Sequence, residues 1–281
     1  MTDNDLGELQ RWLGRKEHCE AMITQQMLDA YRATLAPHLW EVEGIAPPGL
    51  HWCLAPMTVT AAIDELGEDG HPRRGGFLPL VLLPRRMWAG GEVQTLAPLP
   101  VGEIVRREST ISDIRFKEGR SGKLCFVTVQ HELSCRGAVA IRERQDIVYR
   151  NATSAGGALA GSEPPRNGEP QEWVQTPSTL LLRYSALTFN AHRIHYDLPY
   201  ATEVEGYQGL VVHGPLQASL LFNLAARHAQ KVPTRFGYRG MAPLISGQPF
   251  RMAVSRHQEN NLRAWTQDAE GKLSMEASAA C

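Results

Sequence analysis

Asn190, His192 and His195 lie close together in one turn-rich run of the chain, residues 183–197. Histidine has a pKa near neutral pH, so it is the side chain best suited to carry protons in an enzyme. An asparagine amide can hold a water molecule or a carbonyl group, but it cannot accept a proton. This grouping indicates a site for proton transfer, whereas a single histidine is more often a structural residue.

A further histidine, His213, precedes Gly214 and Pro215, where a strand-like run meets an apolar, helix-like run. Proline is favoured in the first turn of a helix, because it has no N–H to leave unpaired there. The backbone N–H of Gly214 is therefore expected at a helix N-terminus, at the positive end of the helix dipole. That position suits the negative oxygen of an enolate. The simpler alternative is a turn that requires a small residue.

Neither a metal ion nor another cofactor is expected. The HxxH spacing of His192 and His195 has no third metal-binding residue near it in the sequence. No glycine pattern has the strand-to-helix context of a nucleotide-binding loop. The five cysteines are odd in number and form no CxxC pair, which is typical of free thiols in a reducing compartment.

The composition predicts a soluble protein of the cytoplasm. Hydrophobic residues make up 43% of the 281 residues and charged residues 21%, so a large core can be buried. The net charge of −1 gives no basic surface for nucleic acid. The longest strongly apolar run, 78–83, is too short to cross a membrane, and the N-terminus has no signal-peptide pattern.

A Pro/Gly-rich run, 151–171, predicts a linker between a first domain, 1–150, and a second, 172–281. The first domain is expected to begin with an amphipathic helix, 16–35, ended by Pro37. A Gly/Pro-rich stretch, 67–91, is expected to be mostly loop. The predicted strands are 91–96, 104–114, 123–135 and 139–149 in the first domain, and 249–254, 262–267 and 273–277 in the second.

A mostly buried helix, 215–226, precedes the strands of the second domain. A helix followed by antiparallel strands is an α+β layout. The first half ends in a similar series of strands, so two related but diverged halves are predicted.

The second half resembles the MaoC-like, (R)-specific enoyl-CoA hydratase family, whose members have the hot-dog fold. The family motif runs Tyr-x-x-Leu, a spacer, Asp-x-Asn-Pro-x-His-x-Asp, and then a His-Gly turn that opens the central helix. Tyr184 and Leu187 match its start, His195 its catalytic histidine, Asp197 its last acid and Gly214 the glycine whose N–H holds the thioester oxygen. The motif's aspartate, asparagine and proline are replaced by Asn190, His192 and Arg193.

The first half resembles the degenerate N-terminal copy of two-domain members of this family. The resemblance therefore implies a double hot-dog, an antiparallel sheet wrapped around a central helix, and suggests a homodimer. The likeness is closest to the itaconyl-CoA and mesaconyl-CoA hydratases, which make citramalyl-CoA, and the replacement at position 190 is expected in this branch. The implied substrate is an acyl-CoA thioester, and no membrane or nucleic-acid partner is implied.

The resemblance also implies roles for individual residues. His195 is expected to deprotonate the attacking water, Asn190 to orient it, and Gly214 to hold the thioester oxygen. His192 is a second proton carrier or an orienting partner. The candidates for contacting the rest of the substrate are His192, His213 and three arginines, Arg86, Arg183 and Arg193, one of which would pair with a substrate carboxylate.

Three alternatives stay open at this point. One is a dehydratase of 3-hydroxyacyl thioesters in fatty-acid metabolism. Another is a hot-dog thioesterase, which commonly uses an acid on the central helix, although 215–226 contains none. The last is a non-catalytic acyl-CoA-binding protein.

Overall fold

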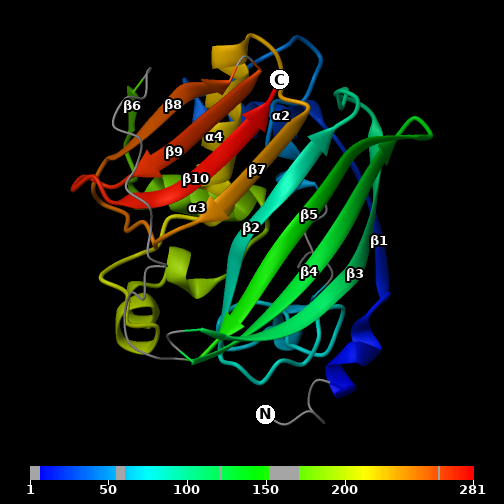
Figure 1. Ribbon diagram of the computed structural model, residues 1–281, viewed down its shortest axis with the longest axis vertical. Coiled ribbons are helices and arrows are strands. Elements are labelled where there is room, and N and C mark those ends of the chain that lie inside the picture. Colours follow the sequence, from blue (N-terminus) through cyan, green and yellow to red (C-terminus); the bar gives the residue numbers. More distant parts are fainter. Residues whose placement is uncertain (1–6, 55–60, 120–121, 152–170, 259) are drawn as a thin grey trace.

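The computed structural model describes residues 7–54, 61–119, 122–151, 171–258 and 260–281 (Figure 1). Within these residues, ten strands form one antiparallel sheet in the order β1-β3-β4-β5-β2-β7-β10-β9-β8-β6. The strands of the first half are β1 (Lys16–Met22), β2 (Arg85–Thr95), β3 (Ile104–Gly119), β4 (Gly122–Cys135) and β5 (Ala138–Arg150). Those of the second half are β6 (Gln171–Val174), β7 (Arg235–Gly240), β8 (Phe250–Gln258), β9 (Asn261–Gln267) and β10 (Leu273–Ala280).

The two halves of the sheet have the same strand order. In each half the first strand lies at an outer edge and the second lies at the centre, where β2 pairs with β7. This equivalence agrees with the predicted pair of related halves. The division into domains at 151–171 stays a prediction, because most of the predicted linker lies outside the described residues. The homodimer also stays a prediction.

Helix α4 (Gly214–Ala229) lies against the second half of the sheet, as Figure 1 shows, and contacts β8, β9 and β10. Every residue from Leu216 to Ala226 is buried. Residues 214–226 of this helix carry no charge and are mostly apolar on all sides, which explains their burial in the core. The predicted helix at 215–226 is confirmed. In the first half the shorter helix α2 (Gln25–Leu35) packs beside α3 (Ser178–Leu187).

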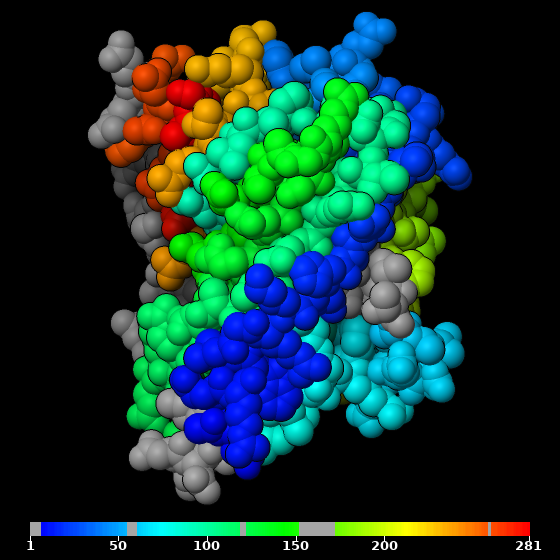
Figure 2. Space-filling model, turned by 90° about the vertical axis from the view of Figure 1, so that its right-hand side faces the viewer, coloured from blue at the N-terminus to red at the C-terminus, as the bar shows by residue number. Residues whose placement is uncertain are grey.

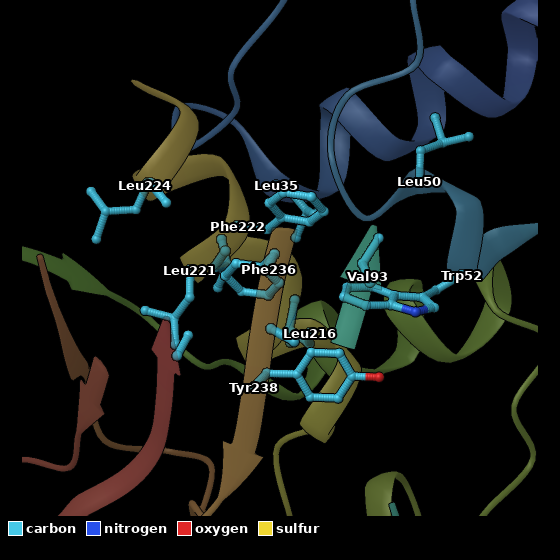
Figure 3. Packing of buried hydrophobic residues seen from close by; sticks show 14 of the residues in the cluster. Leu35, Leu50, Trp52, Val93, Leu216, Leu221, Phe222, Leu224, Phe236 and Tyr238 are labelled. Carbon is cyan, nitrogen blue, oxygen red and sulfur yellow. The ribbon is translucent and has the colours of Figure 1, made fainter. Parts of the chain in front are cut away.

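The main core is shared between the two halves, as the side chains in Figure 3 show. Phe222 of α4 stacks on Phe236 of β7, with ring centroids 4.3 Å apart. Leu35 of α2 and Val93 of β2 belong to the same buried cluster. Because this core crosses the β2–β7 join, the position of each half depends on the other.

The helix predicted at 16–35 is wrong over its first part. Residues Lys16–Met22 form strand β1, in which more and less exposed side chains alternate, and β1 pairs with β3. The helix begins only after Thr24, whose hydroxyl accepts a hydrogen bond from the N–H of Met27. In the later part of this run, Cys19 and Ala21 alternate with larger or charged residues, a two-residue period that indicates a strand.

The other predicted strands are confirmed, but β2 begins at Arg85, inside the stretch 67–91 that was expected to be mostly loop, and not at 91. Strand β3 runs to Gly119, beyond its predicted end at 114, and β6 and β7 were not predicted. The strand-like run at 209–213 forms only an isolated bridge between Val211 and Ile245. It belongs instead to the loop that leads into α4, which matters for the site described below.

The segment before β2, in light blue and cyan, lies at the lower end of the molecule beside the dark blue residues that follow position 6 (Figure 2). Trp12 donates a hydrogen bond to the carbonyl of Gly76, and Leu9 joins a buried cluster with Val81 and Leu83. These contacts fix the loop 61–84 against the sheet. Among the described residues, no helix is both long and apolar enough to cross a membrane.

Candidate active site

His195 lies in a short 3-10 turn, Arg193–His195, between α3 and α4, and it is 6% exposed. Its Nδ1 is 2.7 Å from the carbonyl oxygen of Val211. A carbonyl only accepts hydrogen bonds, so Nδ1 carries the hydrogen and Nε2 keeps a free lone pair. Burial lowers the pKa of His195 to about 4, so the ring is neutral at neutral pH. This is the state that a base requires.

The ring of His213 packs against the ring of His195. The two rings stack with centroids 3.6 Å apart and an interplanar angle of 18°. Nε2 of His213 lies 2.8 Å from the hydroxyl of Ser185, and burial holds the pKa of His213 well below its usual value. His213 is completely buried and does not line the cavity, whereas His195 does. The geometry therefore favours a structural role for His213 over the predicted contact with substrate.

Gly214 opens α4 and lines the same cavity as His195. Its neighbour Pro215 lies in the first helical turn, as predicted. The indole of Trp88, from β2 of the first half, lies so close that a Cβ built on Gly214 would be 2.9 Å from it. Only glycine fits here without displacing that ring.

Asn190 and His192 form a tight turn next to His195. The side-chain oxygen of Asn190 accepts the backbone N–H of His192 at 3.0 Å, which uses one of its two lone pairs. The His192 ring meets the His195 ring edge to face, with centroids 5.4 Å apart. Both Asn190 and His192 line the cavity. Burial keeps the pKa of His192 well below its usual value.

A residue pair that the sequence reasoning did not identify, Asp69 and His71, lies beside this turn. Both come from the loop before β2, in the first half of the chain. The His71 ring is 4.2 Å from the His192 ring, and its Nδ1 is 3.1 Å from a carboxylate oxygen of Asp69. Asp-Gly-His in a Gly-rich run was a usable signal, but its place beside His192 depends on contacts between distant residues.

The three predicted arginines differ in their contacts and in whether they line the cavity. Arg86 lines the cavity, and its charge lowers the pKa of His71. Arg183 does not line the cavity and donates to the carbonyl of Ala33. Arg193 forms an ion pair with Asp197 at 2.8 Å and covers the Tyr200 ring. The geometry therefore favours Arg86 as the partner of a substrate carboxylate.

The cavity has a volume of about 1790 Å³ and is lined by both halves of the chain. Its lining residues near the histidines include Arg73, Arg74, Arg86, Trp88, Asn190 and Gly214. A space of this size exceeds the needs of a small metabolite, so it is large enough for part of a long thioester. Its walls place an apolar ring, a helix N-terminus, histidines and arginines around one volume.

A metal ion was not expected from the sequence, but the fold brings two potential ligands, Asp69 and His71, to His192. Ligand atoms of Asp69, His71 and His192 all lie within 4.8 Å of one another. However, Nδ1 of His71 and the Asp69 carboxylate are already within hydrogen-bonding distance. This describes a carboxylate–histidine pair better than two ligands directed at one ion.

The chain is similar in sequence to hydratases and dehydratases. The family hydroxyacyl-thioester dehydratase type 2 matches residues 49–246, a range that includes both the loop with His71 and the motif with His195. Mesaconyl-C(4)-CoA hydratase of Chloroflexus aurantiacus is 41% identical over 269 residues, which cover 95% of each chain. The mitochondrial hydroxyacyl-thioester dehydratase type 2 of Schizosaccharomyces pombe is 27% identical, over 83% of this chain and 88% of its own.

Solved structures share the fold. A MaoC-like dehydratase from Phytophthora capsici aligns with a TM-score of 0.69 and 15% identity, over 95% of both chains. A Mycobacterium tuberculosis protein described as a double hot-dog aligns with a TM-score of 0.55 and 11% identity, over 95% of this chain and 96% of that one. These likenesses confirm the predicted α+β double hot-dog fold.

Proposed function

Because this chain belongs to the hydroxyacyl-thioester dehydratase type 2 family, one of the MaoC-like hydro-lyases, we propose that it adds water to a branched dicarboxylic enoyl-CoA. The substrate that we propose is mesaconyl-CoA or its isomer itaconyl-CoA, and the product is citramalyl-CoA. Hydro-lyase chemistry on a CoA thioester follows from the family. The identity of the acyl group is the proposal.

One observation carries this function: a neutral histidine base and a helix N-terminus line one cavity. The Nδ1–H of His195 is held by the carbonyl of Val211, which leaves Nε2 as the atom that can take a proton. Gly214 lines the same cavity at the first turn of α4. A base for water and a donor for the thioester oxygen are the two groups that hydration of an enoyl thioester needs.

In the proposed reaction of mesaconyl-C(4)-CoA, whose double bond is conjugated with the thioester, Nε2 of His195 takes a proton from water while the water oxygen bonds to the β-carbon. The electron pair of the double bond moves onto the α-carbon and the thioester oxygen, where the N–H of Gly214 stabilises the negative charge. The His195 imidazolium then gives its proton to the α-carbon, and the ring returns to its neutral state. Dehydration is the same sequence reversed.

Arg86 supports the choice of a dicarboxylic acyl group. In mesaconyl-C(4)-CoA the free carboxylate is attached to the β-carbon, the atom that water attacks, so its partner must lie near the base. Arg86 lines the cavity, and its charge acts on both Asp69 and His71. An arginine paired with a carboxylate is left uncompensated when the substrate lacks one, which penalises plain acyl groups.

The test is a panel of enoyl-CoA thioesters with and without a second carboxylate, followed by the loss of enoyl absorbance. We expect kcat/KM to favour mesaconyl-CoA over crotonyl-CoA by roughly a hundredfold or more, because polar sites reject analogues that lack the matching group. Arg86→Met should erase this preference and spare the weaker activity on crotonyl-CoA. The matched control is Arg106→Met, an exposed arginine of β3.

Equal kcat/KM values for mesaconyl-, itaconyl- and crotonyl-CoA in the wild type would refute the proposed substrate. They would favour a dehydratase of ordinary 3-hydroxyacyl thioesters, the activity for which the Schizosaccharomyces pombe relative is named. A thioesterase is disfavoured, because α4 contains no acidic residue.

A further inference from the structure

The loop that carries Asp69 and His71 is fixed against the motif of the second half. The backbone N–H of Arg193 donates to the carbonyl of Asp69 at 3.0 Å, and the Arg193 guanidinium donates to the carbonyl of Glu68 at 3.0 Å. Between these residues and His71 lies Gly70, where a Cβ would be 1.9 Å from the carbonyl oxygen of Ala191. This close approach, at a positive φ of 84°, requires glycine and holds the loop at the site.

Asp69 determines which nitrogen of His71 carries the hydrogen. One carboxylate oxygen accepts the backbone N–H of His71 at 3.0 Å, and the other lies 3.1 Å from Nδ1. Burial alone would raise the pKa of Asp69. The hydrogen bonds from His71, the charge that His71 carries when it is protonated, and the charge of Arg86 bring this pKa well below its usual value. An ionised carboxylate only accepts hydrogen bonds, so Nδ1 of His71 carries the hydrogen and Nε2 is an acceptor.

His71 is neutral for the same reason as His195. Burial lowers the pKa of His71 to about 4, the charge of Arg86 acts in the same direction, and Asp69 opposes both. His71 lines the cavity, as His195 does. Two imidazole rings, each with its Nδ1–H held by an oxygen, are therefore available on one cavity as acceptors of hydrogen bonds.

The residue that should be the second acceptor is a weaker acceptor in this chain than the aspartate of the family motif. Position 190 holds asparagine where the family motif has its aspartate, and the Asn190 oxygen already accepts the N–H of His192. The remaining polar group of Asn190 is an NH2, which only donates. For the second hydrogen of a water held by His195, the motif therefore offers only the other lone pair of a neutral amide oxygen, which is a weaker acceptor than a carboxylate.

We propose that His71, oriented by Asp69, is the second acceptor for the attacking water. This inference rests on the proposed hydratase function. His71 is a catalytic residue in this account, because it touches the water, and Asp69 is a positioning residue. Asp69, from the first half of the chain, supplies the carboxylate that the motif lacks. It acts on the water through His71 and does not touch it.

The water then loses one hydrogen and keeps the other. Nε2 of His195 takes the first as the oxygen bonds to the β-carbon, and the imidazolium passes that proton to the α-carbon. Nε2 of His71 accepts the second hydrogen throughout, so the O–H becomes the hydroxyl of the product. Both rings end neutral, and no further reactant is needed.

The test compares two replacements of His71 that separate hydrogen bonding from packing. His71→Phe keeps a ring but removes the acceptor, whereas His71→Gln loses the ring and keeps an oxygen that accepts. We expect His71→Phe to lower kcat about 10- to 100-fold, the usual effect of an unmade hydrogen bond, and His71→Gln to lower it less. KM should change by less than about threefold in both, since the water and not the thioester loses its partner.

The variant Asp69→Asn provides a second test of the proposal. An amide can donate to Nδ1 of His71 and so place the hydrogen on Nε2, which should lower kcat by a similar factor. The double variant Asp69→Asn/His71→Phe should be no worse than His71→Phe alone, because the two residues act as a unit. Asp64→Asn, the same change at an exposed position of the same loop, is the matched control and should leave kcat unchanged.

The outcomes separate this inference from the proposed function. If the wild type hydrates an enoyl-CoA and His71→Phe retains more activity than His71→Gln, His71 acts by packing and the inference is overturned. Loss of wild-type activity on treatment with a chelator, restored by zinc, would make Asp69, His71 and His192 ligands of an ion instead. A wild type inert toward the whole panel overturns the proposed function, and the inference with it.

Discussion

Gly214→Ala is the substitution for which the structure allows the sharpest estimate. The added methyl group would lie 2.9 Å from Cε3 and 3.4 Å from Cζ3 of the Trp88 indole. Carbon atoms in contact prefer a separation of about 3.5–4.0 Å, so the ring or the helix start must move by about 0.5–1 Å. Trp88 is confined, because it stacks on Tyr238 with centroids 4.3 Å apart and meets the edge of Trp52. The helix start must therefore take part of the shift.

A shift of this size is large for an oxyanion donor, which acts at about 2.7–3.1 Å from the oxygen. Losing such a donor typically costs about 3–4 kcal/mol of barrier, or a factor of about 100 to 1000 in kcat. Overpacking costs about 1–3 kcal/mol of folding free energy, and the higher helix propensity of alanine offsets up to about 1 kcal/mol of it. We therefore expect kcat to fall at least about 100-fold in a variant that stays folded.

The assay follows the loss of enoyl absorbance of mesaconyl-CoA, with circular dichroism to establish folding. Gly7→Ala is the matched control, because a Cβ at Gly7 meets nothing within 4 Å. The double variant Gly214→Ala/Trp88→Leu makes room for the methyl group and should regain part of the lost activity. A folded Gly214→Ala variant with the kcat of the wild type would refute the role of this turn in holding the thioester oxygen.

Three further predictions concern protons and the motif. Since His195 must be neutral to take a proton and its pKa is lowered to about 4, kcat/KM should fall as the pH drops through about 4, and a limb near the ordinary pKa of about 6.5 would contradict this. Asn190→Ala should lower kcat less than His195→Ala, because no proton carrier is lost, and Asn190→Asp should stay folded; an Asn190→Asp variant inert toward every enoyl thioester would argue against a shared water site. Burial would raise the pKa of Glu143, but the charges of His51, whose Nε2 is 3.6 Å away, and of His131, together with the hydrogen bond from Trp52, hold it at about 2. Because that folded-state pKa lies below the unfolded value of about 4.3, Glu143 stabilises the fold above that pH and the contribution is lost as the pH falls toward about 2. Urea denaturation at a series of acidic pH values should show a smaller loss of unfolding free energy in Glu143→Gln than in the wild type, and equal losses would contradict the assignment.

The sequence was most informative where local patterns suffice. The β-branched runs between Ile104 and Tyr149 predicted three strands correctly. Each of these strands pairs with its neighbour in the sequence, so local patterns were sufficient. The uncharged helix at 215–226 was equally clear, since its lack of charge matches its burial. The run 16–22 was misread, because a strand at the edge of a sheet shows only a weak alternation, and a true helix follows directly.

Some residues of the candidate site could likewise be predicted from the sequence, and others could not. Asn190, His192, His195 and Gly214 could be found from the motif, and all four line one cavity. The place of Asp69 and His71 beside this group could not, because the contact joins the two halves of the chain and depends on the tight approach of Gly70 to Ala191. Nor could the direction of Arg183, whose partner is the carbonyl of a residue in α2.

The most direct test of the account is whether the purified protein adds water to mesaconyl-CoA at the histidine cavity. The measurement is the loss of enoyl absorbance, together with a product heavier by the mass of one water, for the wild type and for His195→Ala. We expect turnover by the wild type and a kcat at least about 100-fold lower in His195→Ala, because the general base is removed. A wild type that leaves the enoyl group unchanged, or a folded His195→Ala variant with undiminished turnover, would contradict it.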